Sequence, residues 1–234
     1  MRKLLVMVLF LTMSGTSALA GDESKETERL HNAANVITEI MGTPESSIPG
    51  ELLDRAVCIG VIPSQLKFAL GIGGSYGRGC LICRRGGDGA WGAPSMFTVG
   101  GVNIGFQLGG QATDFVLVVM NGSGARKLLQ SKTKLGADAS AAAGPVGRAA
   151  SGATDLQLQA EILTYSRSRG LFAGVSLEGA AVIQDTASNT KLYGKKTGPK
   201  DILFTDKVPV PEAAQPLVKA LTKYSPRGGQ KFQD

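Results

Sequence analysis

The sequence predicts an α+β domain in which a curved, mostly antiparallel, barrel-like β-sheet carries helices from the N-terminal and C-terminal parts of the chain. Two observations point to the sheet. Apolar residues alternate with polar ones through much of the middle of the chain, and glycine, with 32 residues in 234, interrupts these runs. Glycine within a strand often marks a bend or a close approach of two backbones. A third observation points to the helices, since apolar residues recur every three or four positions within residues 22–41 and 211–223.

The clearest strand pair lies between residues 144 and 179. Apolar side chains fall at every second position over 156–162, and the alternation resumes over 171–177. Between the two runs stands Ser166-Arg167-Ser168-Arg169-Gly170, whose glycine and small polar residues favour a turn. We therefore expect a β-hairpin whose turn holds Arg167 and Arg169 out in solvent.

The first half of the chain is predicted to combine two helices with short strands. The helix over 22–41 ends at Gly42 and Pro44, and residues 48–53 open a second short helix. Strands are predicted at 56–62 and 80–84, with the glycine-rich residues 71–79 between them as flexible or closely packed backbone. A turn at 85–89 leads to Trp91, the sole tryptophan, which we expect to start a strand and to lie in the core.

The second half continues the sheet and ends in a helix. Residues 95–120 are predicted to form two or three strands, of which the apolar 115–120 is buried on both faces. A short helix at 125–130, a loop-like stretch at 136–152 and a strand at 180–184 follow. Residues 189–200 are predicted as a basic connection and 225–234 as a disordered tail. One domain is therefore expected over 21–224.

The first twenty residues have the features of a cleavable secretory signal. Arg2 and Lys3 precede a short apolar run, and Ala18 and Ala20 give the small-residue pattern of a cleavage site before Gly21. An uncleaved anchor is the alternative, but a membrane span needs ~20 apolar residues. No cysteine stands at the cleavage site, so a lipoprotein is not expected. We expect an exported protein, periplasmic or extracellular.

Charge is distributed unevenly along the chain. The formal net charge of +6 becomes +4 when Arg2 and Lys3 leave with the signal. Residues 22–55 hold eight acids and three bases, whereas residues 126–200 hold eleven bases and five acids, so the second region should attract anions. Nucleic acid is a poor candidate, because export removes it as a partner and the bases are not interleaved with aromatic residues for stacking.

Three cysteines leave one of them unpaired. Export permits a disulfide from Cys58 to Cys80 or to Cys83. Cys80 and Cys83 have the spacing of a redox pair, but they lie in a predicted strand, where no helix N-terminus would stabilise a thiolate. A zinc site would lack a fourth ligand, because the sole histidine, His31, is distant in sequence. We therefore expect no bound metal and no redox role.

Motifs for catalysis and for nucleotide cofactors are missing from the sequence. Hydrolysis usually needs a base beside a nucleophile, and a single histidine gives a Ser-His or Cys-His dyad little support. No helix and ribose-binding acid follow the glycines at 71–79, as a dinucleotide site requires. Four aspartates near turns or strand ends are expected to make local hydrogen bonds; they are Asp114, Asp138, Asp155 and Asp185. We expect neither an enzyme nor a cofactor.

Three stretches of sequence, taken in their order, resemble one known family. They are WGAPSMFTVGGVNIGFQLGGQATDFVLVVMN from residue 91, GPVGR from residue 144 and TYSRSRGLFAGVSLEG from residue 164. Together they resemble the SYLF-domain family, over about residues 48–193. This resemblance implies a lipid-binding domain of the kind found in bacterial exported proteins and in eukaryotic membrane and actin-patch proteins. It implies phosphoinositide-like headgroups as ligands. In a bacterial envelope, phosphatidylglycerol or cardiolipin would be the available anionic lipids.

Basic residues at predicted turns and strand ends are the candidate headgroup ligands. Guanidinium groups bind phosphate in pairs of hydrogen bonds, and each cation near an anionic leaflet contributes on the order of 1 kcal/mol. The candidates are Arg148, Arg167, Arg169, Lys132, Lys134, Lys195 and Lys196. For each of them, a scattered solvated charge is the alternative. The sequence therefore predicts non-catalytic, peripheral binding to anionic phospholipids, with a protein-interaction module of the envelope or a carrier of an apolar ligand as alternatives.

Overall fold

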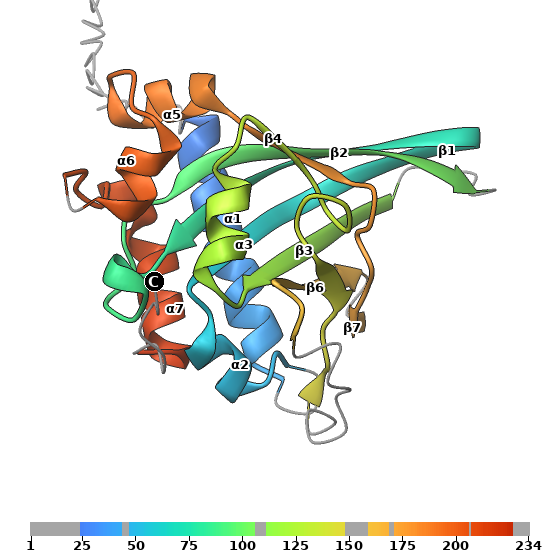
Figure 1. Ribbon diagram of the computed structural model, residues 1–234, viewed down its shortest axis with the longest axis horizontal. Helices are drawn as coiled ribbons and strands as arrows, with labels where there is room; N and C mark the ends of the chain where they lie inside the picture. Colours follow the sequence, from blue (N-terminus) through green and yellow to red (C-terminus); the bar gives the residue numbers. More distant parts are fainter. Residues whose placement is uncertain are drawn as a thin grey trace, which may run out of the picture.

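The computed structural model of this chain describes residues 24–43, 47–105, 111–147, 159–168, 171–205 and 207–226. The predicted signal at 1–20 lies outside these residues, and so does the predicted tail from 227 onward. Over the described residues the predicted fold class is confirmed. Eight strands form one curled sheet of mixed direction, and helices from the N-terminal and C-terminal parts of the chain pack on it (Figure 1).

The strands follow the order β4-β8-β2-β1-β3-β6-β5 across the sheet, and β7 also pairs with β6. All paired strands are antiparallel except β5 and β6, which run parallel. The strands are β1 (Cys58–Cys83), β2 (Ser95–Gly105), β3 (Gln111–Val119), β4 (Lys132–Lys134), β5 (Ala141–Ala143), β6 (Ile162–Ser168), β7 (Leu171–Gly174) and β8 (Ala181–Gln184). The predicted buried strand is β3, next to β1 in the middle of this order. The predicted hairpin exists as β6 with β7, but its first strand was placed too early: β6 begins at Ile162, where the predicted strand over 156–162 ends, and it contains residues 166–168 of the predicted turn.

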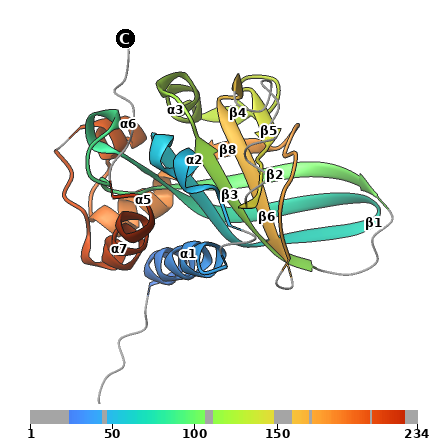
Figure 2. The same cartoon turned by 90° about the horizontal axis from the view of Figure 1, so that it is seen from below.

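Helices account for most of the remaining described residues. Ser24 caps the first of them, because its hydroxyl oxygen accepts a hydrogen bond from the Thr27 amide at 3.2 Å. The helices are α1 (Lys25–Met41), α2 (Gly50–Arg55), α3 (Gly122–Leu128), α5 (Thr186–Tyr193), α6 (Pro199–Phe204) and α7 (Gln215–Tyr224), with 3-10 turns η2 (Arg85–Gly87) and η4 (Glu212–Ala214). Figure 2 shows α1 and α7 side by side at one face of the sheet.

Each face of the sheet has its own apolar core. On one face, Leu30 of α1 and Leu217 of α7 pack with Ile82 of β1. On the other face, Phe97 of β2 and Phe115 of β3 pack with α6 and with the segment that follows α3. Successive strand residues point to opposite faces, so the alternation seen in the sequence supplies both cores. Burying one such large apolar side chain contributes about 1.5–3 kcal/mol.

Strand β1 differs from the prediction, because the two predicted strands and the glycines between them are one element. Its ends lie together: Cys58 forms a disulfide with Cys83, and the Arg84 amide donates to the Val57 carbonyl at 2.9 Å. The strand thus bends back on itself (Figure 1). A side chain at Gly77 would stand 2.6 Å from Ile62, so the predicted close packing of this backbone is confirmed there.

Three further predictions need correction. The basic connection at 189–200 contains the end of α5 and the start of α6, because Gly194, at φ +68°, ends one helix and Pro199 starts the next. Trp91 is buried as predicted, but it forms only an isolated bridge with Arg84, and β2 begins at Ser95. Ser225, which the sequence placed in the tail, is completely buried.

Candidate functional site

Arg167, a predicted headgroup ligand, is engaged in ion pairs instead of projecting into solvent. From β6 its Nε and Nη2 donate to Asp114 Oδ2 at 3.0 and 2.7 Å, and its Nη1 contacts the Glu39 carboxylate of α1. Burial lowers the pKa of Arg167. The side chain connects β6 to β3 and α1, because one guanidinium group satisfies acids from both elements. The expectation that the hairpin presents this cation to solvent is therefore wrong.

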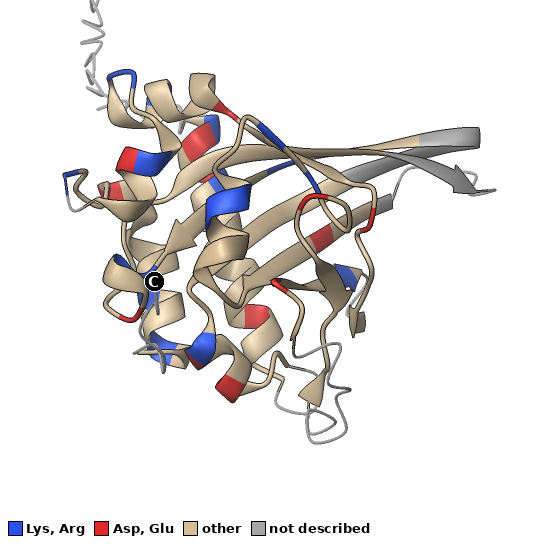
Figure 3. Cartoon of the chain, viewed as in Figure 1, with Lys and Arg blue, Asp and Glu red and all other residues tan. Residues whose placement is uncertain are grey.

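The other candidates fall in three places. Arg148 and Arg169 lie outside the described residues. Lys195 and Lys196 are exposed in the short segment between α5 and α6. Lys132 and Lys134 are exposed on β4, an outer strand of the sheet. Figure 3 shows that basic residues are spread over several elements, so only part of the predicted set can form one surface.

Lys132 and Lys134 belong to two rows of side chains that cross four strands. In the first row Lys132 pairs with Ile183 of β8, Ile183 with Thr98 of β2, and Thr98 with Arg78 of β1. The second row contains Lys134, Ala181, Gly100 and Tyr76. Directly paired residues point to the same face of a sheet. This face therefore gathers three cations with two exposed apolar side chains, and we name it the basic sheet face: Arg78, Lys132, Lys134, Tyr76 and Ile183.

The exposed apolar residues make the basic sheet face unusual. Tyr76 is 49% exposed and Ile183 39%, and over the described ranges the only other exposed large apolar side chain is Leu171 of β7. Two acids stand near the β4 end of the rows. Asp138 accepts a hydrogen bond from the Lys134 amide at 2.7 Å, and Glu178 packs beside the turn that contains Gly136. Neither Lys132 nor Lys134 forms an ion pair with another residue that the structure describes.

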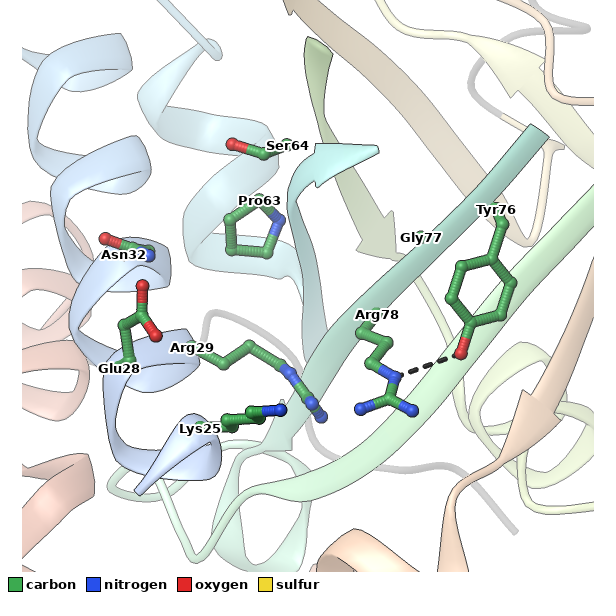
Figure 4. A pocket seen from close by; sticks show the side chains of 9 residues that line it. All are labelled: Lys25, Glu28, Arg29, Asn32, Pro63, Ser64, Tyr76, Gly77 and Arg78. Atoms are coloured by element: carbon green, nitrogen blue, oxygen red, sulfur yellow. Dashed lines mark hydrogen bonds between the residues drawn. The ribbon is translucent and has the colours of Figure 1, made fainter. Parts of the chain in front are cut away.

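A cleft of about 250 Å³ opens where α1 meets β1, next to the basic sheet face. Its lining is rich in cations: Lys25, Glu28, Arg29, Asn32, Pro63, Ser64, Tyr76, Gly77 and Arg78. Figure 4 shows the terminal groups of Lys25, Arg29 and Arg78 directed toward one another, while the Glu28 carboxylate turns toward Asn32. Arg78 donates from Nε to the Tyr76 hydroxyl at 3.0 Å. We name this feature the α1–β1 cleft.

Arg29 is the buried cation of this cleft, at 7% exposure. Its Nη1 lies 4.0 Å from Asp185 Oδ2 and is buried without a hydrogen-bond partner among the residues that the structure describes. Burial lowers the pKa of Arg29; the Asp185 carboxylate opposes this effect and the Arg78 cation reinforces it. An anion placed between the two guanidinium groups would therefore favour the charged form of Arg29.

A bulge in β1 shapes the opposite wall of the cleft. The pairing of β1 with β3 shifts register between Ile62 and Gln65, and Ser64 adopts a φ of +53°, which is rare for a residue with a side chain. The Ser64 amide donates to Asp114 Oδ1 at 2.8 Å. Asp114, which also binds Arg167, therefore stabilises the turn that brings Pro63 and Ser64 to the cleft.

Two residue spacings in the sequence could have pointed to this cleft, but counting charges by region did not reveal them. Lys25 and Arg29 are four residues apart, one turn of a helix, and Tyr76 and Arg78 are two apart, on one face of a strand. Both pairs lie outside the basic region 126–200, in an acidic helix and a glycine-rich segment. Periodicity could have grouped each pair. Only the tertiary packing of α1 on β1 brings the two pairs together.

The cysteines follow the predicted pattern, whereas the prediction of local hydrogen bonds is wrong for Asp114, whose partners Ser64 and Arg167 lie 50 and 53 residues away. Asp155 lies outside the described residues. Cys58 pairs with Cys83, one of the two predicted alternatives, and Cys80 is free and buried. Burial raises the pKa of the Cys80 thiol to about 12, with Arg29 opposing. Asp185 caps α5 by accepting from the Ser188 amide at 3.0 Å. Within the described ranges, no group of three or more metal-ligating side chains gathers, and no helix is long and apolar enough to cross a membrane.

Comparison with known proteins then decides the family. The sequence model described as "Ysc84: Las17-binding protein actin regulator" matches residues 100–224, more than half of the chain. The chain belongs to the Ysc84 family. The SYLF resemblance is thereby confirmed. Within this Ysc84 match lie Lys132 and Lys134, whereas Lys25, Arg29 and Arg78 precede it.

Three Ysc84 relatives show the extent of the similarity. Protein YSC84 of Saccharomyces cerevisiae is 37% identical over 177 residues, which cover 74% of this chain and 37% of that protein. SH3 domain-containing YSC84-like protein 1 of Rattus norvegicus is 32% identical over 204 residues, 87% of this chain and 59% of that protein. LAS seventeen-binding protein 3 of Saccharomyces cerevisiae is 35% identical over 189 residues, 78% and 40% respectively. The chain thus spans less than two thirds of the length of each relative.

Proposed function

We propose that this chain is exported and binds anionic phospholipid headgroups at a membrane surface, without catalysing a reaction. The observation that carries this function is the basic sheet face, where two rows of paired residues bring Lys132, Lys134 and Arg78 to one side of the sheet. Exposed Tyr76 and Ile183 lie in the same rows. Cations around exposed apolar side chains suit the interface between headgroups and acyl chains.

The expected strength of this binding is modest. At about 1 kcal/mol for each cation near an anionic leaflet, three cations contribute about 3 kcal/mol, a factor of roughly a hundred in affinity. The exposed Tyr76 and Ile183 add contacts that do not depend on charge. Binding of this kind is reversible and weakens as salt screens the charges.

The disulfide supports export. A bridge between Cys58 and Cys83 persists in an oxidising compartment, and such bridges are rare in the cytosol.

We expect cleavage of the signal after Ala20, so that the mature chain begins at Gly21. Mass spectrometry of the protein from its native source tests this expectation. A chain that retains residues 1–20, or that is recovered with Cys58 and Cys83 reduced, would argue against export.

Vesicle flotation tests the lipid part. The wild-type protein should float with phosphatidylcholine vesicles that contain phosphatidylglycerol, and much less with phosphatidylcholine alone. The charge-reversed variant Lys132→Glu/Lys134→Glu should bind at least about thirtyfold more weakly, since it removes two attractive charges and adds two repulsive ones. Equal flotation with neutral and anionic vesicles would contradict the proposal.

A matched variant separates the basic sheet face from net charge. Lys219→Glu/Lys223→Glu changes the formal charge by the same amount on exposed positions of α7. It should reduce flotation far less than the β4 variant. An equal loss in both variants would show that overall charge, and no particular surface, governs binding.

A protein partner is the second candidate, because the family description names a Las17-binding actin regulator and one relative is named a LAS seventeen-binding protein. Cosedimentation with actin filaments and pull-down with purified Las17 test this directly. Saturable binding that persists in lipid-free samples would favour it.

A further inference from the structure

We infer that the α1–β1 cleft binds a phosphoryl anion, as carried by a phosphate monoester that is either free in solution or part of a lipid headgroup. This inference deepens the proposed function by naming a headgroup class, but the chemistry of the cleft does not require a membrane.

Charge is the first argument. Lys25, Arg29 and Arg78 line the cleft together with one acid, Glu28, so the lining carries two net positive charges. A phosphate monoester with both acidic protons removed carries two negative charges, whereas the phosphodiester of a lipid such as phosphatidylglycerol carries one. Figure 4 shows the three cationic groups directed into one space with the Glu28 carboxylate turned away from them. Asp185, 4.0 Å from Arg29 Nη1, and the buried Glu26 offset part of this charge from outside the lining. The three convergent cations still favour an anion with several charged oxygens, as a phosphoryl group has.

Unused donors are the second argument. Arg29 Nη1 is buried and makes no hydrogen bond to any residue in the described ranges, and burying such a donor costs free energy unless an acceptor arrives. Arg78 uses its Nε on the Tyr76 hydroxyl, and its two terminal nitrogens make no hydrogen bond to any residue that the structure describes. Phosphoryl oxygens accept such guanidinium donors in pairs.

Rigidity is the third argument. The Asp185 carboxylate stands 4.0 Å behind Arg29, and the Tyr76 hydroxyl fixes Arg78 from its Nε side. Asp114 holds the Ser64 turn on the facing wall. Arg29 and Arg78 are thus restrained before a ligand arrives, which lowers the entropy cost of binding.

The test titrates inorganic phosphate into the full-length protein at constant ionic strength, with binding followed by NMR and calorimetry. Arg78→Gln, at an exposed position, should weaken phosphate binding about tenfold or more, because it removes charged donors, and Lys25→Gln should weaken it as well. Lys219→Gln, at an exposed position of α7 outside both the cleft and the basic sheet face, should leave the phosphate affinity unchanged. Wild-type affinity in Arg78→Gln, or an equal response to chloride, would overturn the inference.

Two further arms distinguish the source of the phosphate. If the ligand is a lipid, wild-type protein should prefer phosphatidic acid to phosphatidylglycerol in phosphatidylcholine vesicles, and Arg78→Gln should lose that preference. If the ligand is soluble, glycerol phosphate should bind with the same dependence on Arg78, and the two vesicle types should bind alike. Failure of both arms overturns the inference even if Lys132→Glu/Lys134→Glu abolishes flotation, so the cleft and the basic sheet face can fail separately.

Discussion

Two arginines are buried in the described part of the fold, and they differ in what their guanidinium groups contact. Arg84 is 1% exposed and donates to the carbonyls of Ala56 and Gly89 at 3.2 and 3.1 Å. Its Nη2 donates to the carbonyl and the hydroxyl of Ser225, and its guanidinium carbon lies 4.1 Å from the centre of the Trp91 ring. Arg29 is 7% exposed, yet its Nη1 has no hydrogen-bond partner in the described part of the chain.

The difference separates a structural cation from one that can take a ligand. Burial lowers the pKa of Arg84 and of Arg29, so both pay a desolvation cost. At Arg84, fixed carbonyl groups compensate that cost and connect the end of β1 to the residue after α7. At Arg29 the compensation is incomplete, because Asp185 lies at the outer limit of an ion pair. An external anion would complete it.

The largest effect is expected at Arg84. Replacing it in Arg84→Met should lower the free energy of unfolding by about 3–5 kcal/mol, because several buried acceptors lose their donor at once. Urea unfolding followed by circular dichroism measures the change. Arg126→Met, at an exposed position of α3, is the control and should stay within about 0.5 kcal/mol. A loss at Arg84 as small as that of the control would contradict the structural role.

Arg167 is an intermediate case, with a side chain 22% exposed between two acids. Arg167→Met should cost about 1–2 kcal/mol, since Asp114 loses its cation but keeps the Ser64 amide. The double variant Arg167→Met/Asp114→Asn should recover part of this loss, because no buried carboxylate is then left unpaired. Chemical denaturation of the three proteins measures the coupling. Strictly additive losses would mean that the pair does not stabilise the fold.

Glu161 forms an ion pair whose contribution to stability should depend on pH. It accepts from Lys127 Nζ at 2.8 and 2.7 Å, from the Ser123 hydroxyl and from the Ser140 amide. Burial alone would raise the pKa of Glu161, but these donors outweigh it and lower the pKa. A lowered carboxyl pKa stabilises the fold above the unfolded value of about 4.3, and that contribution disappears as pH falls through the folded pKa. Glu161→Gln should therefore cost about 1 kcal/mol at neutral pH and progressively less below about pH 4. A stability difference that does not change with pH would contradict this account.

Local patterns were enough to predict elements whose partners are near in sequence or whose periodicity is strong. Helix α1 and strands β3 and β7 follow from apolar spacing, and the stretches that carried the family resemblance include β3 and β7. Strand β6 was misplaced, because the apolar alternation in the sequence ends at Ile162, where β6 begins. Strand β1 was split in the prediction, because glycines at 77 and 79 look like a break in a linear pattern. In the fold they allow one half of the strand to pack against the other, with Val61 2.5 Å from a side chain placed at Gly79.

Basic residues were harder to assign, because their availability depends on acids from distant elements. Arg167 was predicted to face solvent from its place in a turn, but Asp114 of β3 and Glu39 of α1 meet it. Lys132 and Lys134 became part of a surface only through their register with β8, β2 and β1. The sequence gives the position of each basic residue in the chain, but only the packed structure shows which acidic residues lie beside it.

The smallest effect on stability is expected at Arg29, although it is almost as buried as Arg84. Arg29→Met should change the free energy of unfolding by less than about 1 kcal/mol in phosphate-free buffer, because an unpaired donor is removed together with its desolvation cost. Asp185 stays satisfied, since it also accepts from the amide and the hydroxyl of Ser188. Urea unfolding with and without phosphate measures both states. Added phosphate should stabilise the wild-type protein and leave Arg29→Met unchanged, because a ligand stabilises only the state that binds it. A loss as large as that of Arg84→Met without phosphate would instead make Arg29 a structural cation of the same kind.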